Sequence, residues 1–244
     1  MSEQKAARDR RASFSGSVAL FCLAIVVYLI FRWVLFEPFV IPSGSMIPTL
    51  LVNDHIIVKK FAYGVRVPFT KKWLTGPYVP KRGDVVVFRS VDQEDYYLIK
   101  RVVGLPGDRV EYTEAGELKI NGQPVIDKEM PTPSDWTSAD IQEPVSNIRA
   151  FRERLGLHKH WEILERGDYH YPQPEIVVPA GELFAMGDNR DRSRDSRYWG
   201  EFPLKNLIGR ATWVWLGCSV TLSQVDFLCD PRYIRWHGLI HQIE

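Results

Sequence analysis

The chain has 244 residues, of which 45% are hydrophobic and 25% are charged, and its formal net charge at pH 7 is +1. This length suits one globular unit with a possible subdomain. The near-neutral balance provides no overall basic field of the kind that binds nucleic acid, so we expect no nucleic-acid partner. The charge is uneven at the start, where four basic residues from Lys5 to Arg11 outweigh Glu3 and Asp9.

A long apolar run follows this basic segment. No charged residue lies between Ser13 and Phe31, and the run continues past Arg32 to Phe36. A helix over residues 14–36 would be about 34 Å long, and a hydrocarbon core is about 30 Å thick. The sequence therefore predicts a membrane anchor over residues 13–36. By the positive-inside rule, residues 1–12 are expected in the cytoplasm and the rest of the chain outside it.

A cleavable signal peptide is the alternative explanation of the apolar run. Such a peptide has a shorter core followed by a small-x-small cleavage site. Here large residues such as Leu35 and Phe36 follow the core, and the first small pair is Ser43 and Ser45. This favours a retained anchor.

Short β-type runs separated by Gly and Pro turns occupy most of the chain after the anchor. Turn signals include Pro106-Gly107 and Asn121-Gly122. Frequent short strands of this kind predict a mainly β fold. The expected strands are Ile56–Lys59, Asp84–Arg89, Tyr96–Val103, Arg109–Thr113, Leu118–Ile120, Ile176–Val178, Leu183–Met186 and Ala211–Leu216.

Residues 125–175 have a different composition, rich in Pro, Ser and charged residues. Few strands are expected here, and Asn147–Leu155 is a candidate helix. His158, His160 and His170 also lie here, but no acidic or cysteine ligands complete a set at zinc-site spacing. We expect these histidines on surface loops and predict no metal site.

The three cysteines have different expected environments. Cys22 lies inside the predicted anchor, where a free cysteine behaves as a small apolar residue. Cys218 and Cys229 lie in the exported part, where disulfides are permitted. Their separation suits a hairpin closed by a bridge, which we favour, and two free thiols are the alternative.

Three separate segments carry the residues of chemical interest. Pro42–Pro48 places two serines and a glycine between prolines, which restrict the backbone to an extended or turn form. Tyr97–Asp108 carries Lys100, and Gly187–Gly200 carries a dense set of polar residues. In this order behind an apolar run, the three segments closely resemble the boxes of the bacterial type I signal peptidases, membrane-bound Ser/Lys proteases. The resemblance extends from about Phe36 to Gly217.

The residues themselves support a serine nucleophile with a lysine base. A serine hydroxyl is a poor nucleophile until a base takes its proton. His55 is the histidine nearest these segments, but no acid lies at a position typical of a catalytic triad, so we expect a polar residue at a strand start. Lys100 has apolar neighbours on both sides. Desolvation among them would lower its pKa from about 10.4 and make a neutral amine available, as in Ser–Lys variants of the catalytic triad.

The resemblance implies a role for each matching residue. Ser45 is the expected nucleophile and Lys100 the expected general base, and Ser193 is expected to orient the lysine amine. The Ser45 N–H and the Ser43 hydroxyl would form the oxyanion hole. The residues expected to support the site are Gly187, Asp188 and Asn189 in its loop and the ion pair of Asp195 and Arg197.

The resemblance also implies a specificity. Signal peptides carry small residues at the first and third positions before the cut, so shallow apolar pockets are expected. Their expected lining is Phe39, Ile41, Pro42, Met46, Leu50, Leu98 and Ile99. Two positions depart from the family pattern, since Leu98 replaces a frequent tyrosine and Arg192 replaces an asparagine.

The implied fold is a largely antiparallel β catalytic domain with an inserted second β subdomain. We expect the extracytoplasmic domain over residues 37–244, with its core at about 37–108 and 176–217. The insertion would cover about 109–175, and a C-terminal tail would cover 218–244. The implied protein lies in the bacterial inner membrane, needs no cofactor, and has preproteins carrying signal peptides and the phospholipid bilayer as partners.

Three rival interpretations remain. A cytoplasmic self-cleaving repressor also uses a Ser/Lys pair, but it would need a DNA-binding helical domain in place of the apolar run. A membrane-anchored binding or scaffold protein with decayed catalysis would have lost at least one of Ser43, Ser45, Lys100 and Ser193, all of which are present. A mitochondrial inner-membrane relative is the third, although the third segment is more typical of bacterial sequences.

Overall fold

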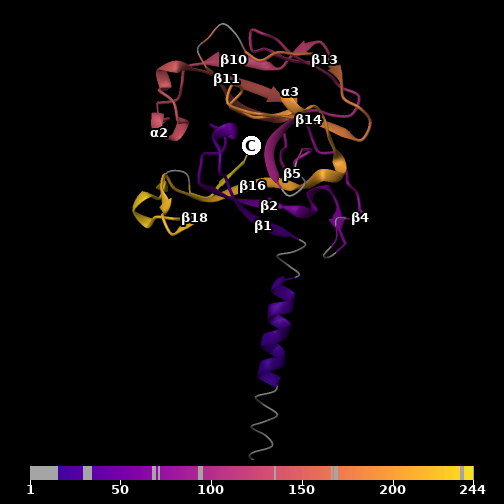
Figure 1. The fold of residues 1–244 in the computed structure, drawn as a ribbon, viewed down its shortest axis with the longest axis vertical. Helices are drawn as coiled ribbons and strands as arrows, with labels where there is room; N and C mark the ends of the chain where they lie inside the picture. The colour runs from indigo at the N-terminus through magenta and orange to yellow at the C-terminus, as the bar shows by residue number, and fades with distance from the viewer. Residues whose placement is uncertain are drawn as a thin grey trace, which may run out of the picture.

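The computed structural model describes residues 16–29, 35–67, 70, 72–92, 96–134, 136–165, 167, 170–236 and 239–243. Its body consists of antiparallel β-sheets, with an N-terminal helix drawn apart from them (Figure 1). The predicted mainly β, antiparallel fold is therefore confirmed.

The largest sheet has the order β1-β2-β16-β5-β6-β14-β15, with β19 also paired to β16. The chain enters it at an edge and returns to its middle through β16, which bonds to both β2 and β5. Apolar residues of these central strands form the core beneath the first chemical segment. The strands are β1 (Phe36–Val40), β2 (Asp54–Lys59), β5 (Val85–Arg89), β6 (Tyr97–Gly104), β14 (Glu182–Met186), β15 (Phe202–Pro203), β16 (Leu207–Gly217) and β19 (His241–Gln242).

Four smaller sheets complete the described β structure. One has the order β13-β7-β8-β9, a second has β10-β11-β12, and the last two are the pairs β3–β4 and β17–β18. Their strands are β3 (Val65–Arg66), β4 (Trp73–Thr75), β7 (Arg109–Tyr112), β8 (Leu118–Ile120), β9 (Gln123–Pro124), β10 (Ile126–Met130), β11 (Ile148–Leu155), β12 (His158–Glu165), β13 (Gln173–Val177), β17 (Thr221–Leu222) and β18 (Val225–Cys229).

Helices within the β body are short. The α-helices are α2 (Ser138–Ile141) and α3 (Ser196–Trp199), and the 3₁₀ helices are η1 (Gly44–Met46), η2 (Lys60–Tyr63), η3 (Val145–Asn147), η4 (Leu204–Asn206) and η5 (Pro231–Tyr233). Figure 1 shows α2 beside the small sheets and at the side of the molecule that carries η1. The helices thus connect the sheets instead of forming a layer of their own.

Each of the eight strands expected from the sequence overlaps an observed strand, and Leu118–Ile120 has the observed bounds of β8. The prediction for the segment Asn147–Leu155 was wrong, because Ile148–Leu155 forms strand β11 and not a helix. Ile148, Ala150 and Leu155 are buried, and β11 pairs with β12 along its whole length. Arginines on the more exposed side gave the segment a helix-like composition, and pairing with β12 overrode that preference.

The prediction of surface loops was wrong for His158 and His160, and for His170, which does lie in a loop, it was wrong about exposure. His158 and His160 lie on β12 and not on a surface loop, and His160 is only 3% exposed. His170 is equally buried, and its Nδ1 lies 2.7 Å from a carboxylate oxygen of Asp191. Charged partners in other segments, which the local sequence does not reveal, compensate for the burial of these rings.

The N-terminal helix is described over residues 16–29, all of them exposed and including Cys22. Among the described residues, no helix combines the length and the apolar character required to cross a bilayer. Residues 1–15 and 30–34, which include the whole predicted tail and parts of the predicted anchor, lie outside the described residues. The predicted end of the anchor was wrong, because Phe36 begins strand β1 and pairs with Lys59 of β2. Pairing with β2 holds Phe36–Val40 extended, and Pro38 disfavours helix at Glu37, the residue before it.

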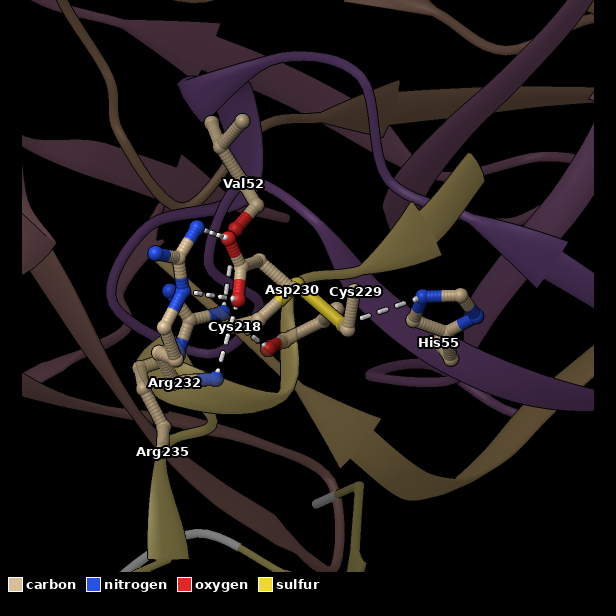
Figure 2. The surroundings of a disulfide bond; sticks show 8 residues. Val52, His55, Cys218, Cys229, Asp230, Arg232 and Arg235 are labelled. Carbon is tan, nitrogen blue, oxygen red and sulfur yellow. Dashed lines mark hydrogen bonds and ion pairs between the residues drawn. A yellow bond between two sulfur atoms is a disulfide. The ribbon is translucent and has the colours of Figure 1, made fainter. Parts of the chain in front are cut away.

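A disulfide joins Cys218 and Cys229 and closes the hairpin β17–β18 (Figure 2). The favoured pairing is thus confirmed. Nε2 of His55 lies 3.5 Å from Sγ of Cys229, and the ring of His55 also packs edge-on against Trp215. His55 and the two cysteine sulfurs lie close enough together to suggest a metal site, but both sulfurs belong to the disulfide. The bridge therefore holds the hairpin against β2.

Candidate active site

Ser45 lies in the 3₁₀ helix η1, directly after β1. Sheet pairing continues beyond β1, because Ile41 N–H donates to the Asp54 carbonyl at 2.9 Å and the Asn53 N–H donates to the Ile41 carbonyl at 2.8 Å. Met46 is fully buried in the core of the main sheet. Ser45 itself is 8% exposed, whereas Ser43 is exposed. The fold thus fixes the Ser45 backbone between a sheet edge and the core.

Lys100 lies on β6, between β5 and β14 in the main sheet. Its Nζ donates to Oγ of Ser45 at 2.6 Å and to the carbonyl of Ile99 at 3.0 Å. The side chain is only 4% exposed. The structure therefore brings the first and second sequence segments together through these two side chains.

Burial lowers the pKa of Lys100 to about 8. Asp195 and Asp188 oppose this shift by favouring the ammonium, and Arg197 adds to it. Desolvation is the dominant effect because it penalises the charged form of a buried amine. Near pH 8 a substantial fraction of Lys100 is thus neutral and able to accept a proton from a hydroxyl.

The third segment packs directly against Ser45. Asn189 donates its N–H to the Ser45 carbonyl and its Nδ2 to the Gly44 carbonyl, both at 3.2 Å. A Cβ on Gly187 would come within 2.3 Å of both the Ser45 carbonyl oxygen and Oγ of Ser193. Only glycine therefore fits at position 187.

Buried ion pairs hold this segment in place. Arg101, next to Lys100 on β6, donates to both carboxylate oxygens of Asp188 at 2.8 and 2.7 Å. Although burial opposes ionisation, Arg101 and its neighbours hold the pKa of Asp188 below its usual value. Asp195 pairs with Arg197 at 2.9 Å and accepts from the Gly187 N–H at 3.0 Å. The expected supporting residues thus form a fixed wall behind the serine.

Ser193 is buried, with 3% exposure. Its hydroxyl has no hydrogen-bond partner among the described residues, and it lies against position 187. The hydrogen bond expected between Ser193 and Lys100 is absent from the contacts of the described side chains.

A pocket of about 320 Å³ opens beside Ser45 and Lys100. Of the residues expected to line substrate pockets, Leu98 does so. Ile41, Met46 and Leu50 are buried in the core, Phe39 and Ile99 pack against that core, and Pro42 is exposed. The pocket is lined by Ser43, Gly44, Ser45, Leu98, Lys100, Ile141, Gln142, Asn189, Arg192 and Arg194.

Sequence reasoning missed the contribution to this pocket of Ile141 and Gln142, which lie in the predicted insertion. Ile141 ends helix α2, and Gln142 follows it with a positive φ of 62°. The side-chain oxygen of Gln142 lies beside Gly44. Thr137 caps α2 by accepting from the Asp140 N–H at 3.1 Å. The pattern Thr137-x-x-Asp140 is a helix-start signal that could have located this helix.

The amino-acid sequence is similar to known proteins of one family. Residues 15–216 match the family model described as signal peptidase, peptidase S26. The chain is 41% identical over 205 residues to signal peptidase I of Pseudomonas aeruginosa, covering 79% of this chain and 69% of the relative. It is 43% identical over 204 residues to signal peptidase I of Pseudomonas fluorescens, with the same coverage. Signal peptidase I of Buchnera aphidicola subsp. Schizaphis graminum is 37% identical over 240 residues, covering 85% and 76% of the two chains. The chain therefore belongs to the peptidase S26 family and is a type I signal peptidase.

Proposed function

We propose that this chain is a membrane-anchored serine endopeptidase that removes N-terminal signal peptides from exported preproteins. In this proposal Ser45 is the nucleophile and Lys100 the general base. The observation that carries it is the 2.6 Å contact between Nζ of Lys100 and Oγ of Ser45 in a buried setting. The pKa of Lys100, lowered to about 8 by burial, supports the role of base.

The reaction follows from this pair. The neutral amine of Lys100 takes the proton of Ser45 as Oγ attacks the scissile carbonyl, and the resulting ammonium then protonates the leaving amine. Water hydrolyses the acyl-enzyme with Lys100 again as base. The Ser45 N–H and the hydroxyl of Ser43 would stabilise the oxyanion, a type of contact typically worth about 10²–10³ in rate.

The remaining residues of the third segment support this pair in the proposal. Gly187, Asp188 and Asn189 keep the Ser45 backbone in position, and the pair of Asp195 and Arg197 holds their segment. Ser193 is proposed to orient the Lys100 amine through a small side-chain movement once substrate is bound. Its buried, unpaired hydroxyl supports this role, since such a group costs free energy unless a partner is found.

Substrate selection is proposed to depend on the pocket beside the pair. Leu98 gives it an apolar wall, which suits small residues before the cut. Phe39, Ile41, Pro42, Met46, Leu50 and Ile99 would then shape this region, most of them from beneath. Arg192 extends from the third segment and forms an ion pair with Glu165 at 2.6 Å. Arg192 is the second departure from the family pattern, and this ion pair offsets its positive charge.

The proposed location is the bacterial inner membrane, with the N-terminus in the cytoplasm. The basic first segment and the apolar run over residues 13–36 support a single anchor in this orientation. Exposed apolar residues near the C-terminus, Tyr233, Trp236 and Ile240, support an additional contact of the domain with lipid.

The direct test is processing of a preprotein that carries an Ala-x-Ala site by the detergent-solubilised chain, with the cut mapped by mass. Ser45→Ala and Lys100→Ala are each expected to abolish cleavage, and the double variant to be no worse, because the two groups act as a unit. Lys119→Ala, at a lysine on β8 away from the pocket, is the matched control. Normal turnover by Lys100→Ala would contradict the mechanism.

A further inference from the structure

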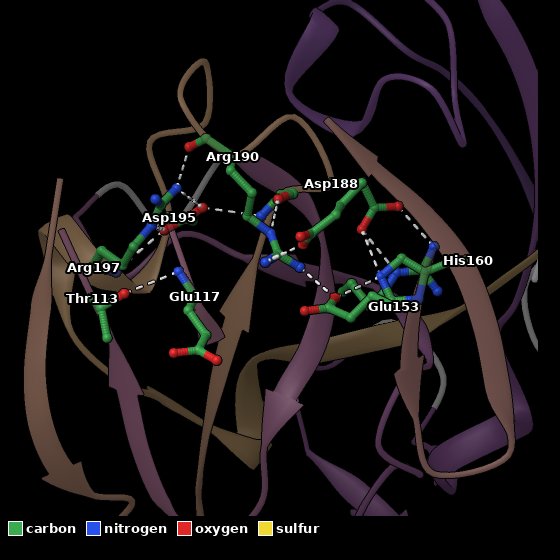
Figure 3. A network of polar contacts seen from close by, with 11 residues as sticks. Thr113, Glu117, Glu153, His160, Asp188, Arg190, Asp195 and Arg197 are labelled. Carbon is green, nitrogen blue, oxygen red and sulfur yellow. Dashed lines mark hydrogen bonds and ion pairs between the residues drawn. The ribbon is translucent and has the colours of Figure 1, made fainter. Parts of the chain in front are cut away.

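The inserted region carries a cluster of buried charges on the hairpin of β11 and β12. Glu153 and Glu162 are fully buried and His160 is 3% exposed. Glu153 lies directly opposite His160 in the strand register, and Nε2 of His160 lies 2.9 Å from its carboxylate. Charged residues of this kind are almost never buried unless they are paired. Their partner is Arg190, from the segment that packs against Ser45 (Figure 3).

Arg190 is 1% exposed and forms ion pairs with both Glu153 and Glu162. Its Nε donates to the Gly187 carbonyl at 3.2 Å, within its own segment. Backbone hydrogen bonds join the same two segments. Ile163 of β12 donates to the Asp188 carbonyl at 3.0 Å, and the Arg190 N–H donates back to the Ile163 carbonyl at 3.1 Å. The hairpin is therefore hydrogen-bonded to the segment that holds the nucleophile.

The charges in this cluster do not balance if every acid is ionised. Three carboxyl groups, those of Glu153, Glu162 and Asp188, face two guanidinium groups, those of Arg101 and Arg190. His160 does not supply the missing positive charge, because burial and the nearby Arg101 lower its pKa. One proton on a carboxyl group would restore the balance.

Glu162 is the carboxyl group best placed to carry that proton. No N–H or O–H of the described residues is directed at either of its oxygens, although Arg190 lies within ion-pair distance. Both carboxyl groups contact the same guanidinium of Arg190, so they lie close to each other. Two carboxyl groups can form a hydrogen bond with each other only when they share a proton. Burial raises the pKa of Glu162 well above its usual value; the charge of Arg190 opposes this rise, and the charge of Glu153 adds to it.

Other titratable groups near the cluster do not change this assignment. Tyr112 of β7 lies near both Arg190 and Glu162, and burial raises the pKa of its hydroxyl well above the usual value, so it stays neutral. Asp191 is engaged with His170, and Arg197 is engaged with Asp195. Lys100 interacts with Asp188 and Asp195, but it is engaged with Ser45 and does not act on Glu162.

We propose that Glu153 and Glu162 share one proton, carried by Glu162, and that this carboxyl pair positions Arg190 and thereby the segment 187–190 against Ser45. Both are positioning residues, supplied by the inserted region, for the Ser45 and Lys100 chemistry. The inference rests on the proposed function for its effect on catalysis, whereas the shared proton is independent of it. Loss of the proton would place a second full negative charge beside Glu153 and disturb the contact with Arg190.

The shared proton is tested without any activity measurement. Infrared spectra of the detergent-solubilised full chain at pH 7 should contain the C=O stretch of a buried protonated carboxyl group. Glu162→Gln should remove this band, whereas Glu129→Gln, at an exposed carboxylate of the same sheet, should keep it. A spectrum of Glu162→Gln that retains the band, or a wild-type spectrum without it, overturns the proposal. Ser45→Ala must not alter the band, so this result stands even if the proposed mechanism fails.

The positioning role is tested with the preprotein assay. Glu162→Ala should lower kcat about 10–100-fold with little change in KM, since small misplacements of a site cost about that much. Glu162→Gln, which keeps the shape and supplies a donor to Glu153, should recover most of the loss. In the wild type and in Glu129→Gln, kcat should fall at alkaline pH, where Glu162 loses its proton. Glu162→Gln has no such proton to lose and should not show this fall. Wild-type kcat and an unchanged pH profile for Glu162→Ala would overturn the role.

Discussion

Lys100 and Arg101, neighbours on β6, bind two different segments of the active site. Lys100 contacts Ser45 at 2.6 Å, and Arg101 contacts Asp188 at 2.8 and 2.7 Å. Successive side chains of a strand point to opposite faces of its sheet. The strand therefore fixes the nucleophile through one residue and the segment behind it through the next.

The hydroxyl of Ser43 should act mainly in the transition state. Ser43→Ala is expected to lower kcat about 10²–10³-fold with little change in KM, because an oxyanion donor is lost while ground-state binding remains. The measurement is steady-state cleavage of a preprotein. A raised KM with unchanged kcat would show that Ser43 is a substrate contact instead.

A side chain at position 187 should displace the nucleophile. Gly187→Ala is expected to abolish processing, because its Cβ would lie 2.3 Å from the Ser45 carbonyl oxygen. Gly167→Ala is the matched control, since a Cβ there meets nothing within 4 Å. Cleavage rates and circular dichroism of both variants provide the check. Full activity of Gly187→Ala would contradict the packing described for this wall.

Burial of Lys100 should reduce stability at neutral pH. Its pKa of about 8 in the folded chain lies below the unfolded value, so the folded state binds fewer protons between these values. Stability from this group therefore rises with pH through that window, and the cost is largest below pH 8. Lys100→Met should remove this cost.

The expected gain is up to about 3 kcal/mol in unfolding free energy at pH 7, since one pKa unit corresponds to about 1.4 kcal/mol. The gain should shrink between about pH 8 and about pH 10.4 and vanish above that range, where the lysine is neutral in both states. Urea unfolding at several pH values measures it. A less stable Lys100→Met protein at pH 7 would show that burial of the amine is not costly.

The domain should bind lipid without the N-terminal helix. A chain that begins at Leu35 keeps all of β1 and is expected to sediment with vesicles and to need detergent or lipid for full activity. Trp236, 68% exposed, is a candidate for this contact, and Trp236→Ser should weaken sedimentation. If the shortened chain neither sediments nor responds to detergent, the anchor alone positions the site.

The sequence predicted the strands well, because they depend on local signals, whereas the pairing of Ser45 with Lys100 was implied by the resemblance of the three segments and the structure brings the two side chains into contact. Runs such as Leu118–Ile120 have strand composition with turns at each end, and Lys100 has apolar neighbours in sequence. The inserted region was predicted poorly because long-range pairing decides its structure. Glu153 resembles a solvated helix residue in sequence, yet Arg190 stabilises it in the interior. Gln142 reaches the pocket only through the way the insertion packs.

The pH dependence of kcat/KM for preprotein cleavage tests the central claim most directly, because it reports the ionisation of the free enzyme's base. With Lys100 as the base, kcat/KM should rise as pH increases and reach half its plateau near pH 8, the pKa that burial gives this amine. The mechanism would be contradicted by a rise with its midpoint near 6.5, the usual pKa of an imidazole, or by a profile that Lys100→Ala leaves unchanged.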